Sequence, residues 1–190
     1  MTETDNLISA EQFAEQRHEF PDGGRWAELE AGKVVTLSDT DVDHGTAILN
    51  LSKALAGAVR PIDGYACFDQ RFILARNPDT VRSASVAFFK EGPAFAEMDK
   101  PASETRPALL VEIASTKDRR LAMRDRVEAW LKWGVPHVWV LDTHAKTVHL
   151  FAKHQSPRQL TGTQILTGGE IVPQLSVATN ELFDVPKWYR

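Results

Sequence analysis

Glu112 is the residue that most directly suggests chemistry, because it is the one carboxylate in the apolar stretch from Leu109 to Ile113. Burying an unpaired carboxylate is costly, so such a residue needs a bound cation, a catalytic role or a positively charged neighbour. A basic segment follows closely: residues 117–126 carry five cations against two acids. This segment is also typical of a solvent-exposed helix face with charge pairs.

A strand–helix–strand unit is expected to position these groups. Alternation along residues 109–113 puts Leu110 and Glu112 on one face of a buried strand. A helix over residues 119–133, with Asp118 as its cap and Gly134 as its end, follows. One stripe of this helix contains Arg119, Met123, Arg126 and Trp130. Arg126 is therefore expected to lie near Glu112, and a buried ion pair between them is one way to compensate the charge of Glu112.

The rest of the sequence predicts an α/β fold, in which a mixed sheet is flanked by helices. Ser9 and Gln12 form a capping-box pattern for a short helix, and Asp43 is a plausible cap for a long one. The predicted helices cover residues 10–19, 43–60 and 119–133, and the predicted strands cover a hairpin over residues 25–38 and residues 65–75, 81–90, 109–113, 137–142 and 146–152. We expect one domain over residues 1–190, with an N-terminal helix and hairpin (about 8–38), a core (about 43–152) and a C-terminal extension (153–190).

Composition argues for an ordinary globular protein in a reducing compartment. The 190 residues carry a net charge of −4 and a single cysteine, Cys67, so an internal disulfide is excluded. No stretch approaches the roughly 18 consecutive apolar residues of a membrane-spanning helix. The first ten residues are acidic and polar, unlike a signal peptide. A cytoplasmic location is expected.

Five segments in order carry a resemblance to a known family. They are "WAELEAGKVV", "DHGTAILNL", "LLVEIASTKD", "VEAWLKWGV" and "VWVLD". From about Ile8 to Phe183 the chain resembles the Uma-two family of putative restriction endonucleases, within the PD-(D/E)xK nuclease superfamily. The resemblance implies a restriction-endonuclease-like fold, hydrolysis of DNA with Mg²⁺ or Mn²⁺, and a homodimer.

The resemblance also implies site residues, two of which differ from the family pattern. Glu112 matches the family's strand glutamate, and Glu28 matches its hairpin glutamate. Ser85 stands where the family has its metal-binding aspartate, and Arg126 stands where it has a helix lysine. Serine is a neutral ligand, and arginine stays protonated, so it can clamp a phosphate but cannot accept a proton.

Three features near these positions have structural interpretations. The literal Pro78-Asp79 pair lies six residues before Ser85, which is about 20 Å along an extended strand, and marks a turn. His44 is placed to cap the start of the long helix. Trp130 is expected to fill the core.

These observations leave three hypotheses. The first is an endonuclease-family protein with a degenerate site (Glu112, Arg126, Ser85, Glu28) that cleaves weakly or not at all; a metal, if one binds, is expected at Glu112. The second is a non-catalytic nucleic-acid- or protein-binding module, with Lys117, Arg119 and Arg120 contacting DNA. The third is an active nuclease that has rebuilt its site from Glu28, Glu112 and Lys117.

Overall fold

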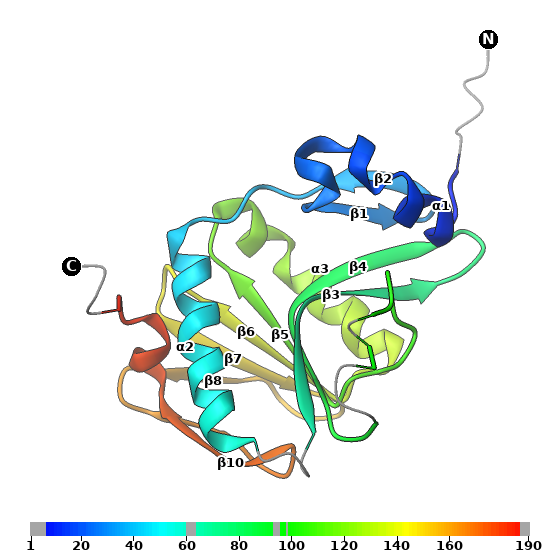
Figure 1. Cartoon of the computed structure of the whole chain (residues 1–190). Helices are drawn as coiled ribbons and strands as arrows, with labels where there is room; N and C mark the ends of the chain where they lie inside the picture. Colours follow the sequence, from blue (N-terminus) through cyan, green and yellow to red (C-terminus); the bar gives the residue numbers. More distant parts are fainter. Residues whose placement is uncertain (1–6, 60–63, 93–95, 98, 187–190) are drawn as a thin grey trace.

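A mixed sheet of eight strands forms the centre of the molecule (Figure 1). The computed structural model describes residues 7–59, 64–92, 96–97 and 99–186. The strand order is β2-β1-β4-β5-β6-β7-β8, and β3 pairs with β4. The strands are β1 (Ala27–Glu30), β2 (Lys33–Thr36), β3 (Tyr65–Ala75), β4 (Thr80–Phe89), β5 (Leu109–Ala114), β6 (His137–Asp142), β7 (Thr147–Ala152) and β8 (Arg158–Thr161). The predicted α/β class and mixed sheet are confirmed.

Two layers cover the faces of this sheet (Figure 1). Helix α2 (Val42–Ala58), the two-stranded sheet of β9 (Ile165–Gly168) and β10 (Val172–Ala178), and the 3-10 helix η3 (Thr179–Phe183) cover one face. Helix α3 (Lys117–Trp133) covers the other. Val111 and Ile113 point into the first layer, whereas Leu110 points toward α3. The alternation predicted for β5 is therefore confirmed.

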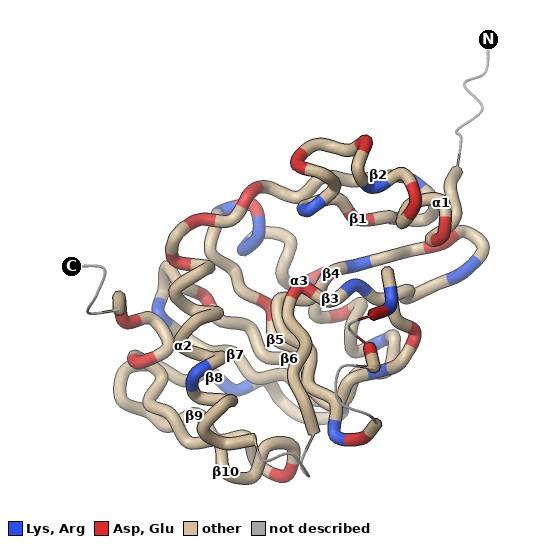
Figure 2. Tube along the Cα trace, viewed as in Figure 1, with Lys and Arg blue, Asp and Glu red and all other residues tan. Residues whose placement is uncertain are grey.

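The strand–helix–strand unit has the predicted connection. Strands β5 and β6 are parallel, and α3 joins them. Gly134 ends α3 in the left-handed conformation, with φ 116°. Figure 2 shows positively charged positions at the start of α3, close to the end of β5. The unit thus brings the basic segment to the carboxyl end of the strand that carries Glu112.

The helix starts differ from the predicted ones by two residues. The cap of α2 is Asp41, whose Oδ1 accepts from the His44 amide at 2.9 Å, so the prediction of Asp43 is wrong. The cap of α3 is Thr116, so the prediction of Asp118 is also wrong. In both cases the expected cap is the second residue of the helix, where an acid still interacts favourably with the helix dipole.

The N-terminal segment closes over one end of the sheet. Helix α1 (Ala10–Glu15) has the predicted capping box but ends earlier than expected, and the 3-10 helices η1 (Arg17–Glu19) and η2 (Pro21–Gly24) follow it. The predicted hairpin turn joins β1 and β2, and Leu29 pairs with Val81 of β4. Asp79 accepts from the Ala10 amide at 2.8 Å and caps its own turn, so the Pro78-Asp79 pair has the structural role expected of it.

The C-terminal segment also joins the fold, since β8 extends the main sheet beside β7. In the described part of the chain, no helix is long and apolar enough to span a membrane.

Candidate active site

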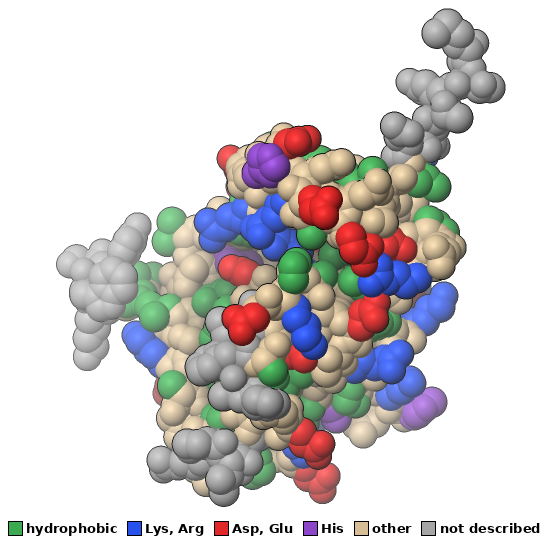
Figure 3. Space-filling view, turned by 45° about the vertical axis from the view of Figure 1, so that its right-hand side comes forward, with side chains coloured by type: hydrophobic (Ala, Val, Ile, Leu, Met, Phe, Trp, Pro, Cys, Tyr) green, Lys and Arg blue, Asp and Glu red, His purple; other side chains and the backbone are tan. Residues whose placement is uncertain are grey.

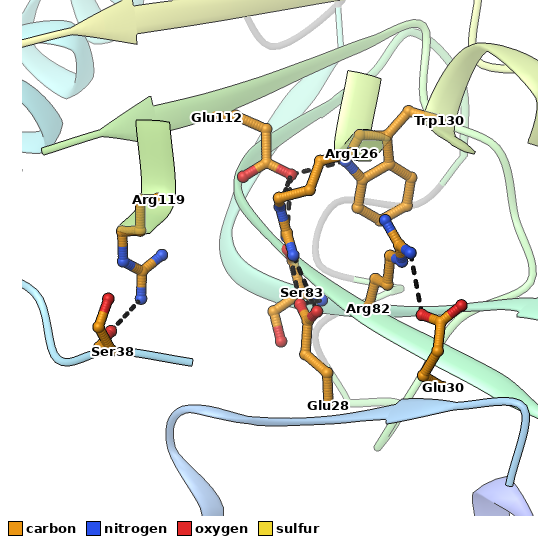
Figure 4. Close-up of polar contacts among 9 residues, drawn as sticks. All are labelled: Glu28, Glu30, Ser38, Arg82, Ser83, Glu112, Arg119, Arg126 and Trp130. Carbon is orange, nitrogen blue, oxygen red and sulfur yellow. Dashed lines mark hydrogen bonds and ion pairs between the residues drawn. The ribbon is translucent and has the colours of Figure 1, made fainter. Parts of the chain in front are cut away.

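Glu112 lies at the centre of a buried polar cluster (Figure 4). It projects from β5 toward α3 and is 2% exposed. Its Oε1 accepts from Nε and Nη2 of Arg126 at 3.1 and 3.0 Å, and from Nε1 of Trp130 at 2.6 Å. The predicted pairing of Glu112 with Arg126 is present. Trp130 is fully buried, as expected, and also donates to the carboxylate, which the sequence did not indicate.

Strand β1 brings a second carboxylate, Glu28, to the same guanidinium. Arg126 donates from Nη1 to Glu28 Oε2 at 2.8 Å and from Nη2 to Glu28 Oε1 at 3.1 Å. Ser83 of β4 completes the cluster: its amide donates to Glu28 Oε1 at 2.7 Å, and its carbonyl accepts from Arg126 Nη2 at 2.6 Å. Arg126 therefore joins three strands, β1, β4 and β5, through one side chain (Figure 4).

The electrostatics of the cluster favour a permanently charged arginine. Burial by itself lowers the pKa of Arg126, but the adjacent Glu112 and Glu28 carboxylates outweigh it and hold that pKa above its usual range. The cluster contains two carboxylates and one guanidinium, so it keeps one uncompensated negative charge. Buried polar groups of this kind are stable only when each is hydrogen-bonded, as all three are here.

The other predicted site residues lie around this cluster. Ser85 is buried and lines a cavity of about 440 Å³ together with Glu112 and Arg119. Lys117 is exposed at the start of α3, whereas Arg120 donates to the Ser115 carbonyl and lines a different cavity. The structure thus brings Ser85 and Arg119 to Glu112 but does not bring Arg120 into the same cavity.

Arginines dominate the lining of this cavity, which we call the arginine cavity. Its cationic and aromatic lining consists of Arg17, Arg25, Arg71, Arg119, His44 and Trp26. The Trp26 ring contacts two guanidiniums, with Arg25 at 4.7 Å and Arg119 at 5.2 Å from its centroid. Arg119 also donates to the Ser38 carbonyl at 3.0 Å (Figure 4). Figure 3 shows Lys and Arg side chains gathered in the upper part of one face, with His and acidic side chains directly below them.

Burial and neighbouring cations lower the pKa values of basic groups that line the arginine cavity. The pKa of Arg71 is lowered to about 10, first by burial and then by the neighbouring Arg17, against the opposing effects of Asp69 and Glu28. Burial also lowers the pKa of His44 to about 4, with Arg119 and Arg25 acting in the same direction against Asp41. His44 is therefore neutral near pH 7. Its amide donates to the cap residue Asp41, so the prediction that His44 caps α2 is wrong; its side chain instead lines the cavity, which its position in the sequence did not reveal.

The residues present do not fit the divalent metal that the family resemblance implies. Arg126 binds both carboxylates, so a divalent ion would have to displace its guanidinium from Glu112 and Glu28. Ser85 offers a neutral hydroxyl where a second acid would be needed. Across the described residues, no group of three His, Cys, Asp or Glu side chains is arranged to hold a metal ion.

Sequence reasoning missed the cations that complete the cavity. Arg17 and Arg25 come from the N-terminal segment, and Arg71 from β3. Arg71 faces Ser83 across the β3–β4 ladder, but the predicted strands did not specify a register. The one available signal was the accumulation of arginine beside aromatic residues in the N-terminal segment, "RHEFPDGGRW".

Comparison with known proteins agrees with the fold. A crystal structure of a putative nuclease belonging to DUF820 from Anabaena variabilis ATCC 29413 superimposes with a TM-score of 0.73 and 15% sequence identity, covering 90% of this chain and 96% of that one. No curated protein matches the sequence significantly. The model of the family Uma2, described as "Putative restriction endonuclease", matches residues 10–180. The chain therefore belongs to the Uma2 family of putative restriction endonucleases.

Proposed function

We propose that this protein has a nuclease fold in which metal-dependent phosphodiester hydrolysis is weak or absent. The observation that carries the proposal is that both carboxylates are paired with the same arginine: Arg126 binds Glu112 at 3.0 Å and Glu28 at 2.8 Å. Metal-assisted hydrolysis needs hard oxygen ligands that are free to bind the ion, and these carboxylates already have a cationic partner.

The two positions that differ from the family pattern, Ser85 and Arg126, support the same proposal. Ser85 offers a neutral hydroxyl where the family has an acid, and the nearby Glu28 carboxylate is itself hydrogen-bonded to Arg126. Arg126 keeps a positive charge but stays protonated, and its donors are directed at Glu28, Glu112 and the Ser83 carbonyl. It therefore can neither exchange a proton near neutral pH nor move as freely as a catalytic lysine is expected to.

Plasmid cleavage tests the proposal. Purified protein is incubated with supercoiled plasmid in Mg²⁺ and in Mn²⁺, together with Glu112→Ala and the matched control Glu128→Ala, which removes an exposed acid of α3. We expect little or no nicking by any of the three. Robust cleavage that is lost only in Glu112→Ala would overturn the proposal.

An active site rebuilt from Glu28, Glu112 and Lys117 predicts a different result. Mn²⁺ would then bind with a defined stoichiometry, and Glu28→Ala would abolish the binding. Lys117 is exposed and Glu28 is held by Arg126, so we rank this possibility below the first.

A second candidate function is metal-independent binding of nucleic acid. The arginine cavity favours it, because clustered guanidiniums suit phosphate oxygens. Binding of this type is expected to weaken steeply as salt increases. Gel retardation in EDTA at low and moderate salt measures it, and the absence of retardation at low salt would leave a protein-binding role.

We further propose the homodimer and the cytoplasmic location that the resemblance and the composition suggest. Light scattering on the purified protein tests the dimer, and a monomeric mass at micromolar concentration would contradict it.

A further inference from the structure

The arginine cavity contains buried hydrogen-bonding groups that the described part of the protein leaves unpaired. They are Nε of Arg17, Nε of Arg71, Nε of Arg119 and Nδ1 of His44, and all four residues line the cavity. Unpaired buried polar atoms are uncommon in folded proteins, because each one has lost its hydrogen bonds to water without a replacement. Arginine Nε can only donate, so its missing partner must be an acceptor.

The charges in the cavity indicate that this acceptor is an anion. Four guanidiniums line the cavity against three carboxylates, Asp22, Asp69 and Glu112. Glu112 shares the Arg126 guanidinium with Glu28, and Asp22 and Asp69, like Arg25, are exposed to solvent, so the partly buried Arg17, Arg71 and Arg119 have no carboxylate of their own among these three. The lowered pKa values of Arg71, Arg119 and His44, caused first by burial, point the same way, since a bound anion would offset that cost.

Several of these cations are held in place by the protein itself. Arg71 donates from Nη2 to the Gly24 carbonyl at 3.1 Å, and Arg119 donates to the Ser38 carbonyl at 3.0 Å. The Trp26 ring contacts the guanidiniums of Arg25 and Arg119. A ligand would therefore meet side chains that are already oriented, which lowers the entropic cost of binding.

The size of the cavity distinguishes between possible anions. A volume of about 440 Å³ lies in the range of small-molecule sites. It is too large for a phosphate ion alone and too small for a DNA duplex, whose major groove alone is about 12 Å wide. A terminal phosphate with its nucleoside suits this volume. It also carries more charge near pH 7 than a phosphodiester and offers three acceptor oxygens.

We propose that the arginine cavity binds the terminal phosphate of a nucleotide, free or at the end of an oligonucleotide, without a metal ion. The anion site follows from the cavity itself. The nucleotide part rests on the proposed function, in which the Glu112 cluster has exchanged a metal for Arg126.

Calorimetry in EDTA tests the inference on the intact protein. Thymidine 5′-monophosphate should bind saturably and thymidine should not. Inorganic phosphate with the same affinity as the nucleotide would overturn the nucleotide part. A single-stranded oligonucleotide with and without a 5′-phosphate separates the two sources: preference for the phosphorylated end supports the proposal, and equal binding overturns the claim of a terminal phosphate.

Variants locate the binding site. Arg71→Gln and Arg119→Gln should each weaken nucleotide binding by about tenfold or more, because each removes a charged donor. Arg124→Gln is the matched control, since Arg124 is an exposed arginine of α3 paired with Glu128, and it should bind as the wild type does. Equal affinity in all three variants would overturn the proposal.

A spectroscopic measurement keeps the test decisive if a variant folds poorly. In the wild type, the nucleotide should raise the pKa of His44, as followed by NMR of its ring protons. The chemical shifts of the His154 ring protons, outside the cavity, are the internal control and should not respond to the nucleotide. No change at His44 at saturating nucleotide would overturn the proposal. Plasmid cleavage in Mg²⁺ would instead overturn the proposed function. The binding measured in EDTA does not depend on that result, so the two proposals can fail separately.

Discussion

Replacing Arg126 with methionine tests the buried cluster most severely. The variant keeps an unbranched side chain that replaces the aliphatic part of arginine but removes the guanidinium that contacts both Glu112 and Glu28. These carboxylates are 2% and 4% exposed, so water does not replace the lost partner. Breaking a buried ion pair from one side costs about 3–5 kcal/mol. For a domain of this size that corresponds to a decrease of roughly 6–20 °C in Tm.

Chemical and thermal denaturation of the wild type and Arg126→Met provide the measurement. Burial without a counter-charge should raise the pKa of the two carboxyl groups in the folded variant above the unfolded value. The destabilisation should therefore be complete at high pH and should decrease as pH falls through the raised pKa values, because protonation removes the unpaired charges.

A triple variant separates lost charge pairing from lost packing. Glu28→Gln and Glu112→Gln, added to Arg126→Met, remove all three charges, and the triple variant should regain most of the lost stability. Two results would refute the reasoning: a cost below about 1 kcal/mol for Arg126→Met, or a triple variant no more stable than the single one.

Three further predictions address other parts of the structure. The pKa of His44 is lowered from 6.5 to about 4, so the unfolded chain binds a proton at a higher pH than the folded one. The free energy of unfolding should therefore decrease by about 3 kcal/mol between pH 6.5 and 4. In His44→Gln this part of the pH profile should be flatter. Thr116→Ala should cost about 1 kcal/mol in urea denaturation because it removes the cap of α3, and Asp118→Ala should cost less; the reverse order would favour the cap expected from the sequence. Trp130→Phe keeps a smaller aromatic ring and removes the 2.6 Å hydrogen bond to Glu112, so it should cost at least about 1.5–3 kcal/mol; a cost near zero would show that this hydrogen bond does not stabilise the fold.

The sequence predicted those parts of the site that depend on local periodicity. Alternation in β5 and the helical stripe of α3 were enough to place Arg126 beside Glu112, because only fourteen residues and one strand–helix connection separate them. The family resemblance added Glu28, and the structure joins it to Arg126 across ninety-eight residues. No periodicity extends over such a separation.

The arginine cavity shows why the rest could not be predicted. Arg71 of β3 and Trp26 before β1 meet only because the N-terminal segment folds over the end of the sheet. The sequence predicted both strands, but it predicted neither their register nor the path of the N-terminal segment over the end of the sheet. The two wrong helix caps have a local cause: Asp41 and Asp43, like Thr116 and Asp118, are alternative caps two residues apart, and the chain around them selects the earlier one.

Binding of Mn²⁺ to the wild-type protein tests the central claim most directly, because it shows whether the charge of Glu112 is compensated by Arg126 or by a metal ion. Titration followed by electron paramagnetic resonance should show no stoichiometric site, and Glu112→Ala should behave as the wild type does. One tightly bound Mn²⁺ per chain that disappears in Glu112→Ala would contradict the account.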